Sequence, residues 1–175
     1  MQIEYNELIN SYFIDYDISI EDYLSFDDIK LKVKMPKQLI KLIDNPIIED
    51  NNIYSFTMLD NENGFPSSYI QDKDLIGIEC AINKINLIDY ARNFIPLTAL
   101  SLLKTGLAFS ILLSRKLESE KSNEKFKIIF SFRISKYVDS VVRFHKIREN
   151  LISFVSSDFK DKPSIDGLLI INTGY

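Results

Sequence analysis

The sequence predicts an α+β protein in which one domain, residues 1–175, contains an antiparallel or mixed sheet of about five strands with one long apolar helix packed on a face. The chain has 175 residues, of which 46% are hydrophobic, so it can form one core that buries roughly 70% of its unfolded surface. Residues 126–134 alternate between apolar and polar side chains, and residues 96–117 are the longest apolar stretch. Strand and helix patterns in one chain of this size indicate a two-layer fold.

Five segments have the patterns expected of strands. In Ile29–Met35 (IKLKVKM) and Phe126–Ile134 (FKIIFSFRI), apolar side chains recur at every second residue, which is the period of a half-buried strand. Gly167–Asn172 (GLLIIN) is a continuous apolar run, as expected of a strand covered on both faces. The predicted strands are residues 29–35, 53–59, 75–82, 126–134 and 167–172.

Helices are predicted between these strands. Pro36 and Pro96 suit the first turn of a helix, because the fixed φ of proline is already helical. The stretch Phe94–Leu113 is long enough to span a membrane, but Lys104 near its middle would cost about 2.5 to 3.5 kcal/mol in a bilayer. We therefore expect a buried core helix and no membrane partner. The predicted helices are residues 3–13, 19–25, 37–44, 96–117 and 137–155.

Residues 137–155 fit two structures. As a helix they place Tyr137, Val141 and Phe144 on one apolar stripe, although Arg148 falls inside that stripe. As a strand, residues 142–145 alternate equally well. We favour the helix.

Charge is unevenly distributed along the chain. Residues 1–89 contain 17 acids and 7 bases, whereas residues 90–175 contain 8 acids and 14 bases, and the net charge of −4 conceals this difference. The first 28 residues have eight acids and no lysine or arginine. Such a field influences which partners a protein meets, and how fast, more than it influences the fold.

Several kinds of chemistry are excluded by residue counts and spacing. The five glycines are isolated, which excludes Walker-type phosphate loops, Rossmann dinucleotide motifs and a serine nucleophile elbow. His145 is the only histidine, so a metal site built on a histidine pair is excluded, and no cofactor is predicted. Cys80 is the only cysteine and cannot form an intramolecular disulfide, and the amino terminus lacks the features of a signal peptide. We expect a cytoplasmic protein.

Within residues 75–82, Cys80 and Glu79 are the two side chains whose reactivity or charge depends on whether they are buried. In the predicted strand Cys80 shares the apolar face and should be a buried, inert thiol. Glu79 points to the opposite face. If both faces are covered, Glu79 becomes a buried carboxylate that needs a partner.

The leading functional hypothesis is a non-enzymatic binding protein. An acidic surface that also carries tyrosine suits the docking of a basic protein partner, as in an inhibitor, immunity protein or antitoxin-like factor, because opposite fields speed encounter and buried rings supply affinity. Alternatively, the acidic segment folds back on a basic sheet face formed by Lys30, Lys32, Lys34, Lys127 and Arg133. The predicted partner-binding residues are Tyr16, Asp17, Glu21, Asp22, Tyr23, Asp27 and Asp28.

Two alternatives use the basic half of the chain. Arginine and lysine on phosphates, with rings on bases, could bind nucleic acid, although the chain is acidic overall and has no RNP, KH or zinc-finger pattern. An enzyme could instead use His145 as a general base, with Arg143 or Arg148 holding an anionic substrate. The predicted nucleic-acid contacts are Arg133, Arg143, Lys146 and Arg148.

Overall fold

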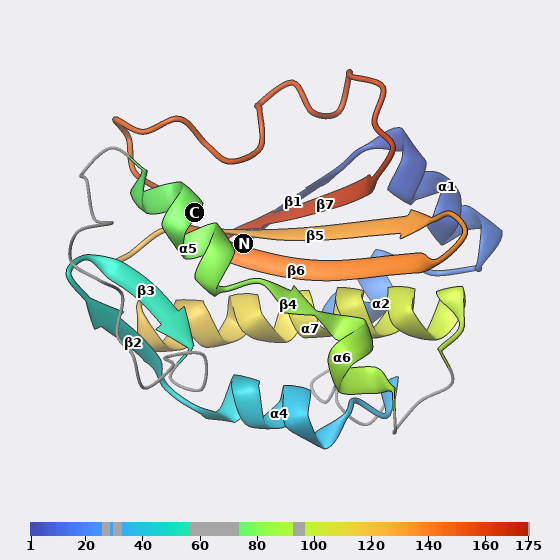
Figure 1. Cartoon of the computed structure of the whole chain (residues 1–175), viewed down its shortest axis with the longest axis horizontal. Coiled ribbons are helices and arrows are strands. Elements are labelled where there is room, and N and C mark those ends of the chain that lie inside the picture. Colours follow the sequence, from blue (N-terminus) through green and yellow to red (C-terminus); the bar gives the residue numbers. More distant parts are fainter. Residues whose placement is uncertain (26–28, 30–32, 57–73, 93–96, 175) are drawn as a thin grey trace.

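A five-stranded antiparallel sheet of order β1-β7-β5-β6-β4 forms the centre of the computed structural model, which describes residues 1–25, 29, 33–56, 74–92 and 97–174 (Figure 1). Its strands are β1 (Gln2–Tyr5), β4 (Ile85–Asn86), β5 (Phe126–Ile134), β6 (Val138–Lys146) and β7 (Gly167–Asn172), and β2 (Ile47–Asp50) and β3 (Ile53–Phe56) form a separate hairpin. The helices are α1 (Glu7–Asp15), α2 (Ile20–Ser25), α4 (Lys37–Asp44), α5 (Leu75–Ile82), α6 (Leu87–Ala91) and α7 (Ala99–Glu120). The predicted fold class is confirmed.

The β5–β6 hairpin is the longest pairing in the sheet. It runs in continuous register from the Phe126–Lys146 pair to the Ile134–Val138 pair. The predicted alternation of β5 is confirmed, because the core-facing side chains are fully buried as far as Phe132 and only Ile134, at the end of the strand, is 39% exposed.

Helix α7 lies between two layers, and most of its residues are therefore buried. It packs on β5, β6 and β7 on one side and on α2, α4 and α6 on the other. Gly106 lets it approach the sheet, since a Cβ there would lie 2.2 Å from Cε2 of Phe130. Thr98 and Ser101 form a capping box at its start. The predicted core helix is confirmed, and within the described residues no helix combines the length and apolar character that crossing a membrane requires.

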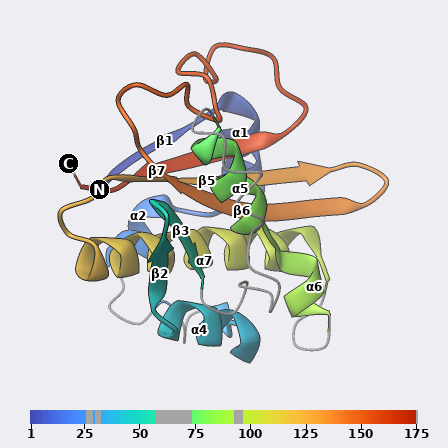
Figure 2. The same cartoon turned by 60° about the vertical axis from the view of Figure 1, so that its left-hand side comes forward.

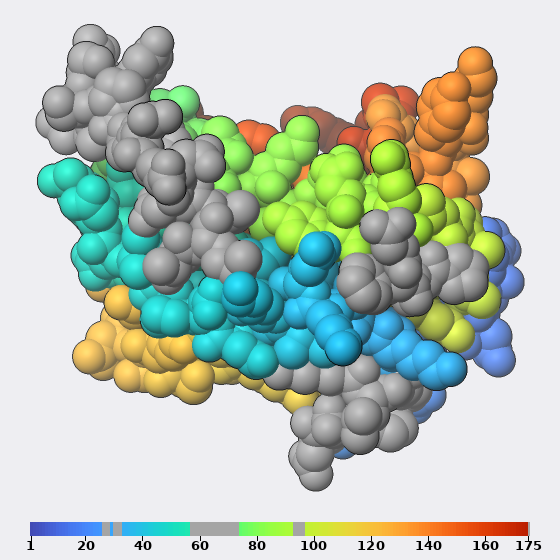
Figure 3. Space-filling view, turned by 60° about the horizontal axis from the view of Figure 1, so that its bottom comes forward, coloured from blue at the N-terminus to red at the C-terminus, as the bar shows by residue number. Residues whose placement is uncertain are grey.

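The remaining elements cover α7 and the far side of the sheet. Figure 3 shows α4 and the β2–β3 hairpin lying next to one another over α7. On the other face of the sheet, α5 packs on β6, and residues 147–166 connect β6 to β7 and arch above the strands in Figure 2. A small buried cluster of Ile76, Cys80 and Ile129 joins α5 to this face.

The strand predicted for residues 29–35 is wrong at the residues that the structure describes. Ile29 and Val33 are helical, and Lys34 has a φ of 47°. Ile29 and Val33 are four residues apart, so a helix also places both against the core, where Ile29 is fully buried and Val33 packs beside it. Alternation over seven residues therefore did not distinguish the two periods.

The strand predicted for residues 75–82 is also wrong, because this segment is helix α5. Asp74 caps it, and its carboxylate accepts a hydrogen bond of 3.0 Å from the backbone N of Gly77. The buried residues Leu75, Ile76, Glu79 and Cys80 follow a helical spacing. A short apolar run fits a buried helix as well as a buried strand.

The helix favoured for residues 137–155 is wrong, and the alternative strand is correct as far as Lys146. All nine residues of β6 pair with β5 across the turn at residues 135–137. Earlier in the chain, the helix predicted for residues 3–13 begins only at Glu7, where Asn6 caps it, since Gln2–Tyr5 pairs with β7. The predicted strand 53–59 is β3 as far as Phe56, and its last three residues lie outside the described part of the chain.

Candidate functional site

The face of the sheet that points away from α7, here called the outer face, has two unlike halves. In the covered half, Ile129 and His145 are buried and Lys127 donates a 2.7 Å hydrogen bond to Ser153 of the 147–166 connection. In the open half, side chains of β5 and β6 line a surface hollow. The open half comprises Ser131, Arg133, Asp139, Val141 and Arg143.

Glu79 organises the boundary between α5, β3 and β6. Its carboxylate is fully buried and pairs with Arg148 at 2.8 Å (Nη1–Oε2) and 2.9 Å (Nη2–Oε1). It also accepts hydrogen bonds from the backbone N of Tyr54 at 2.9 Å and from that of Lys146 at 2.8 Å. The expectation that Glu79 needs a partner if it is buried is confirmed, although it rests on a strand at residues 75–82 where the structure has helix α5. With four donors bound, the carboxylate serves the fold.

His145 is buried next to this pair. Its ring is 1% exposed, and Nδ1 lies 2.9 Å from the carbonyl oxygen of Lys146. Nε2 is buried and has no hydrogen-bond partner in the described part of the chain. Burial lowers the pKa of His145, so the neutral ring is favoured. A general base must lie within hydrogen-bonding distance of its substrate, and this ring is not presented at the surface.

The cations of the basic stretch separate into two groups. Arg148 is held by Glu79, and Nζ of Lys146 pairs with Glu124 at 2.7 Å while lying 5.3 Å from the centre of the Tyr54 ring. Arg133 and Arg143, in contrast, line the same hollow. The structure therefore brings together two of the four predicted nucleic-acid contacts, Arg133 and Arg143, and of all four only Arg143 has no ion pair among the described residues.

The hollow of the open half has a volume of about 250 Å³ and contains charges of both signs. Arg133 is neutralised by Asp139, with which it forms a close ion pair, and by Asp166 at 3.6 Å. Lys84 also lines the hollow. Sequence reasoning missed Lys84, because an isolated lysine before a two-residue strand carries no pattern.

Arg143 differs from Arg133 and Arg148 because it has no carboxylate within ion-pair distance among the described residues. Its charge is balanced only in part, by attraction to Asp166 and by the Phe154 ring. Its side chain is half-buried, and burial lowers its pKa. Among the residues that the structure describes, its guanidinium makes no hydrogen bond and no ion pair. Its nearest ring is that of Phe154, whose centre lies 5.9 Å from the guanidinium carbon and whose side chain is 51% exposed.

The thiol of Cys80 lies under the covered half and is 1% exposed. Burial raises the pKa of Cys80 to about 12, and the nearby Arg143 opposes this shift only in part. The predicted burial of Cys80 is confirmed. A thiol with this pKa forms almost no thiolate at neutral pH, as expected of an inert side chain.

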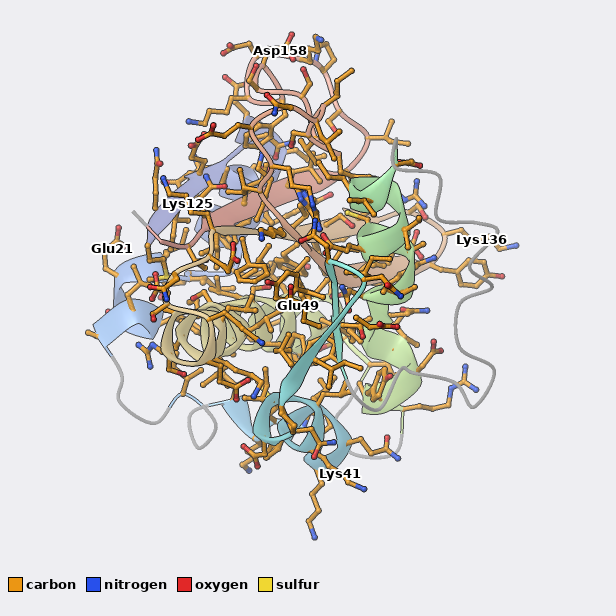
Figure 4. The ribbon with its side chains drawn as sticks, turned by 90° about the vertical axis from the view of Figure 1, so that its left-hand side faces the viewer. Glu21, Lys41, Glu49, Lys125, Lys136 and Asp158 are labelled. Atoms are coloured by element: carbon orange, nitrogen blue, oxygen red, sulfur yellow. The ribbon has the colours of Figure 1, made fainter. Side chains whose placement is uncertain are left out.

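The predicted acidic surface is placed at the junction of α1 and α2. Asp15, Asp17, Glu21 and Asp22 are exposed, and Figure 4 shows Glu21 pointing outward from α2. Ser19 donates a 3.1 Å hydrogen bond to Glu21 and accepts one of 3.3 Å from the backbone N of Asp22.

The aromatic residues of this segment mostly face inward. Tyr23 is 3% exposed and belongs to the core, and Tyr16 is half-buried against it. Asp27 and Asp28 lie outside the described residues. The predicted basic sheet face is wrong at Lys34, which lies in a turn and not in a strand, whereas Lys30 and Lys32 lie outside the described residues. The segment makes a different contact with the basic half, in which Glu4 pairs with Lys160 at 2.8 Å.

Residues 16–163 match the uncharacterized protein PM0498 family, and the chain belongs to this family. No curated protein and no solved structure matches the chain.

Proposed function

We propose that this member of the PM0498 family is a small cytoplasmic binding protein that docks a basic protein partner, in the manner of an inhibitor, immunity protein or antitoxin-like factor. The docking site would be the acidic surface, defined here as Asp15, Asp17, Glu21 and Asp22. One observation carries the proposal. These four carboxylates are exposed within two short segments, and none forms an ion pair with a lysine or arginine among the described residues.

Unpaired carboxylates at this density favour a cationic partner. They repel one another across the surface, and a basic partner relieves that repulsion while the opposite fields speed its approach. The four carboxylates would set the rate at which the partner binds and the salt dependence of that rate. Affinity would require apolar side chains that become buried in the interface.

An apolar contact is present next to the acidic surface. Ile14 is 72% exposed at the end of α1, immediately before Asp15. Tyr16 follows and is half-buried. Tyr23 belongs to the core, so Ile14 and Tyr16 would provide the apolar part of the contact. A single exposed aliphatic side chain is common on protein surfaces, and a partner that docks on the carboxylates would bury this one.

The test uses a variant that removes charge without disturbing the backbone. Asp15→Lys and Glu21→Lys reverse two charges, and Asp17→Asn neutralises a third, because Asp17 has a φ of 50° that asparagine tolerates. The matched control carries Asp50→Lys, Glu149→Lys and Asp89→Asn, which are exposed acids on other elements. Both variants change the net charge equally.

The tagged proteins are incubated with nuclease-treated and untreated halves of a lysate of the source cells, and the retained partner is identified, purified and titrated. We expect a basic protein that is released by salt and that binds the acidic-surface variant at least about tenfold more weakly, while the control binds like the wild type. Equal affinity for all three proteins, or recovery that nuclease abolishes, would contradict the proposal.

A further inference from the structure

The open half of the outer face has cations that its own acids do not neutralise. Three bases and two acids line the hollow, and Asp139 and Asp166 both pair with Arg133. This leaves Arg143 and Lys84 without an ion pair anywhere in the described ranges. Lys84 is exposed and solvated, but Arg143 is half-buried.

A half-buried arginine without a partner has a cost in the free protein. Its guanidinium remains charged, since arginine does not deprotonate in proteins. Its partial removal from water is offset only by Asp166, which lies beyond ion-pair distance, and by the Phe154 ring. A ligand that supplies an anion at this position would recover that cost. Phe154 lies 5.9 Å away and would keep water from such a contact.

Two exposed apolar side chains lie in the 147–166 connection, one beside Arg143 and the other next in sequence to a residue of the hollow. Phe154 is 51% exposed, and Ile165, which precedes the hollow-lining Asp166, is 75% exposed. Arginine and aromatic side chains are enriched at the centres of protein interfaces. The hollow itself, at about 250 Å³, is smaller than the roughly 300 to 1,000 Å³ of pockets that enclose small ligands. It would therefore receive one charged group of a larger partner.

We propose that the open half of the outer face is a second docking surface, which binds an acidic segment of a partner protein. A carboxylate of that segment would pair with Arg143 and Lys84, and neighbouring apolar side chains would cover Phe154 and Ile165. The surface is separate from the acidic surface of α1 and α2, and its occupant has the opposite charge.

The mixed charge of the hollow favours a polypeptide over nucleic acid. A phosphodiester chain carries a negative charge at every nucleotide and would meet Asp139 and Asp166 as well as the cations. A peptide can place one carboxylate beside Arg143 and apolar residues elsewhere. An aliphatic side chain such as Ile165 also gains more from an apolar peptide than from a base, which stacks on rings.

The experiment is a selection from a displayed library of random dodecapeptides on the immobilised full-length protein. Peptides that bind the wild type are counter-selected on Arg143→Gln, and the enriched sequences are synthesised and titrated. We expect sequences with aspartate or glutamate beside apolar residues, which bind Arg143→Gln and Lys84→Gln at least about tenfold more weakly. Circular dichroism measures whether each variant is folded. If Arg143→Gln is unfolded, Lys84→Gln still tests the proposal, because Lys84 is exposed.

Lys41→Gln is the matched control, because Lys41 is exposed on α4 and points into solvent in Figure 4. It should bind the peptides like the wild type, as should the acidic-surface variant, so this proposal can fail independently of the first. Enrichment of neutral or basic peptides, no enrichment, or equal binding by Arg143→Gln and Lys84→Gln would overturn it. Binding of an oligothymidylate that depends on Arg143 would overturn it in favour of nucleic acid.

Discussion

Arg148 and Arg143 lie five residues apart and show how the two halves of the outer face differ. Arg148 forms a two-pronged ion pair with the fully buried Glu79, and the backbone of β3 and β6 completes the coordination of that carboxylate. Arg143 is half-buried with no such partner among the described residues. The same residue type therefore stabilises the fold in one place and is left unsatisfied in the other.

The covered half is closed by complementary packing as well as by charge. Ile76, Cys80 and Ile129 form a buried cluster, with Leu151, Val155 and Leu168 packed around it. No comparable set of side chains covers Arg133 and Arg143 in the described part of the chain, and they border a hollow. Arg143 is a half-buried cation beside a hollow and has no ion pair among the described residues, which makes it a candidate for function.

Removal of the Glu79 carboxylate should produce the largest effect. We expect Glu79→Ala to lower the free energy of unfolding by about 3 to 5 kcal/mol, because Arg148 becomes an unpaired buried charge and two backbone donors lose their acceptor. Urea denaturation followed by circular dichroism measures this loss. Glu149→Ala, at an exposed position, should change stability by less than about 0.5 kcal/mol.

A second variant sharpens this comparison. In Glu79→Ala with Arg148→Met, both charges are absent, and part of the lost stability should return because no buried ion remains unpaired. If the single variant unfolds at the same urea concentration as the wild type, Glu79 does not hold the covered half together.

The stability of the covered half should also depend on pH through His145. Burial lowers its pKa in the folded state, so below about pH 6.5 the unfolded chain binds a proton that the folded protein does not. Stability should therefore fall as pH falls, by up to about 1.4 kcal/mol per pH unit from this residue, until the pH reaches the folded-state pKa.

Urea denaturation of the wild type and of His145→Gln at pH 7.5, 6.5 and 5.5 tests this expectation. Comparing how steeply the free energy of unfolding changes with pH in the two proteins removes the contribution of the titratable groups that both share. The variant should show the flatter dependence, and parallel curves would mean that the ring of His145 becomes protonated without cost in the folded state.

The smallest effect on stability is expected at Arg143. We predict that Arg143→Met changes the free energy of unfolding by no more than about 0.5 kcal/mol or increases it, because the substitution removes an unpaired, half-buried charge and keeps the apolar stem. Thermal denaturation gives the result. A loss of more than about 2 kcal/mol would show that Arg143 supports the fold, as Arg148 does.

The sequence alone determined the elements whose pattern is long or bounded by clear signals. Nine alternating residues predicted β5, a continuous apolar run predicted β7, and Pro36 at its first turn predicted α4. The length and low charge of residues 96–117 predicted α7, although its start at Ala99 follows from the cap at Thr98. In these segments local propensity and burial favour the same structure.

Only the tertiary structure decided the short apolar segments. Residues 75–82 fit either a strand or a helix until their neighbours are known, and residues 138–146 became a strand because β5 offers nine pairing positions across a short turn. Pairing and packing energies at these positions exceed the weak local preference.

The candidate sites were also predicted from the sequence only in part. Charge counting located the acidic segment, because exposed acids in sequence remain neighbours at the surface. It also indicated that Glu79 would need a partner if buried, but that partner, Arg148, lies 69 positions further along the chain. The distinction between Arg148 and Arg143 could not be predicted, since both are arginines in one basic stretch. The state of each charge depends on what other elements place beside it, and that is a property of packing.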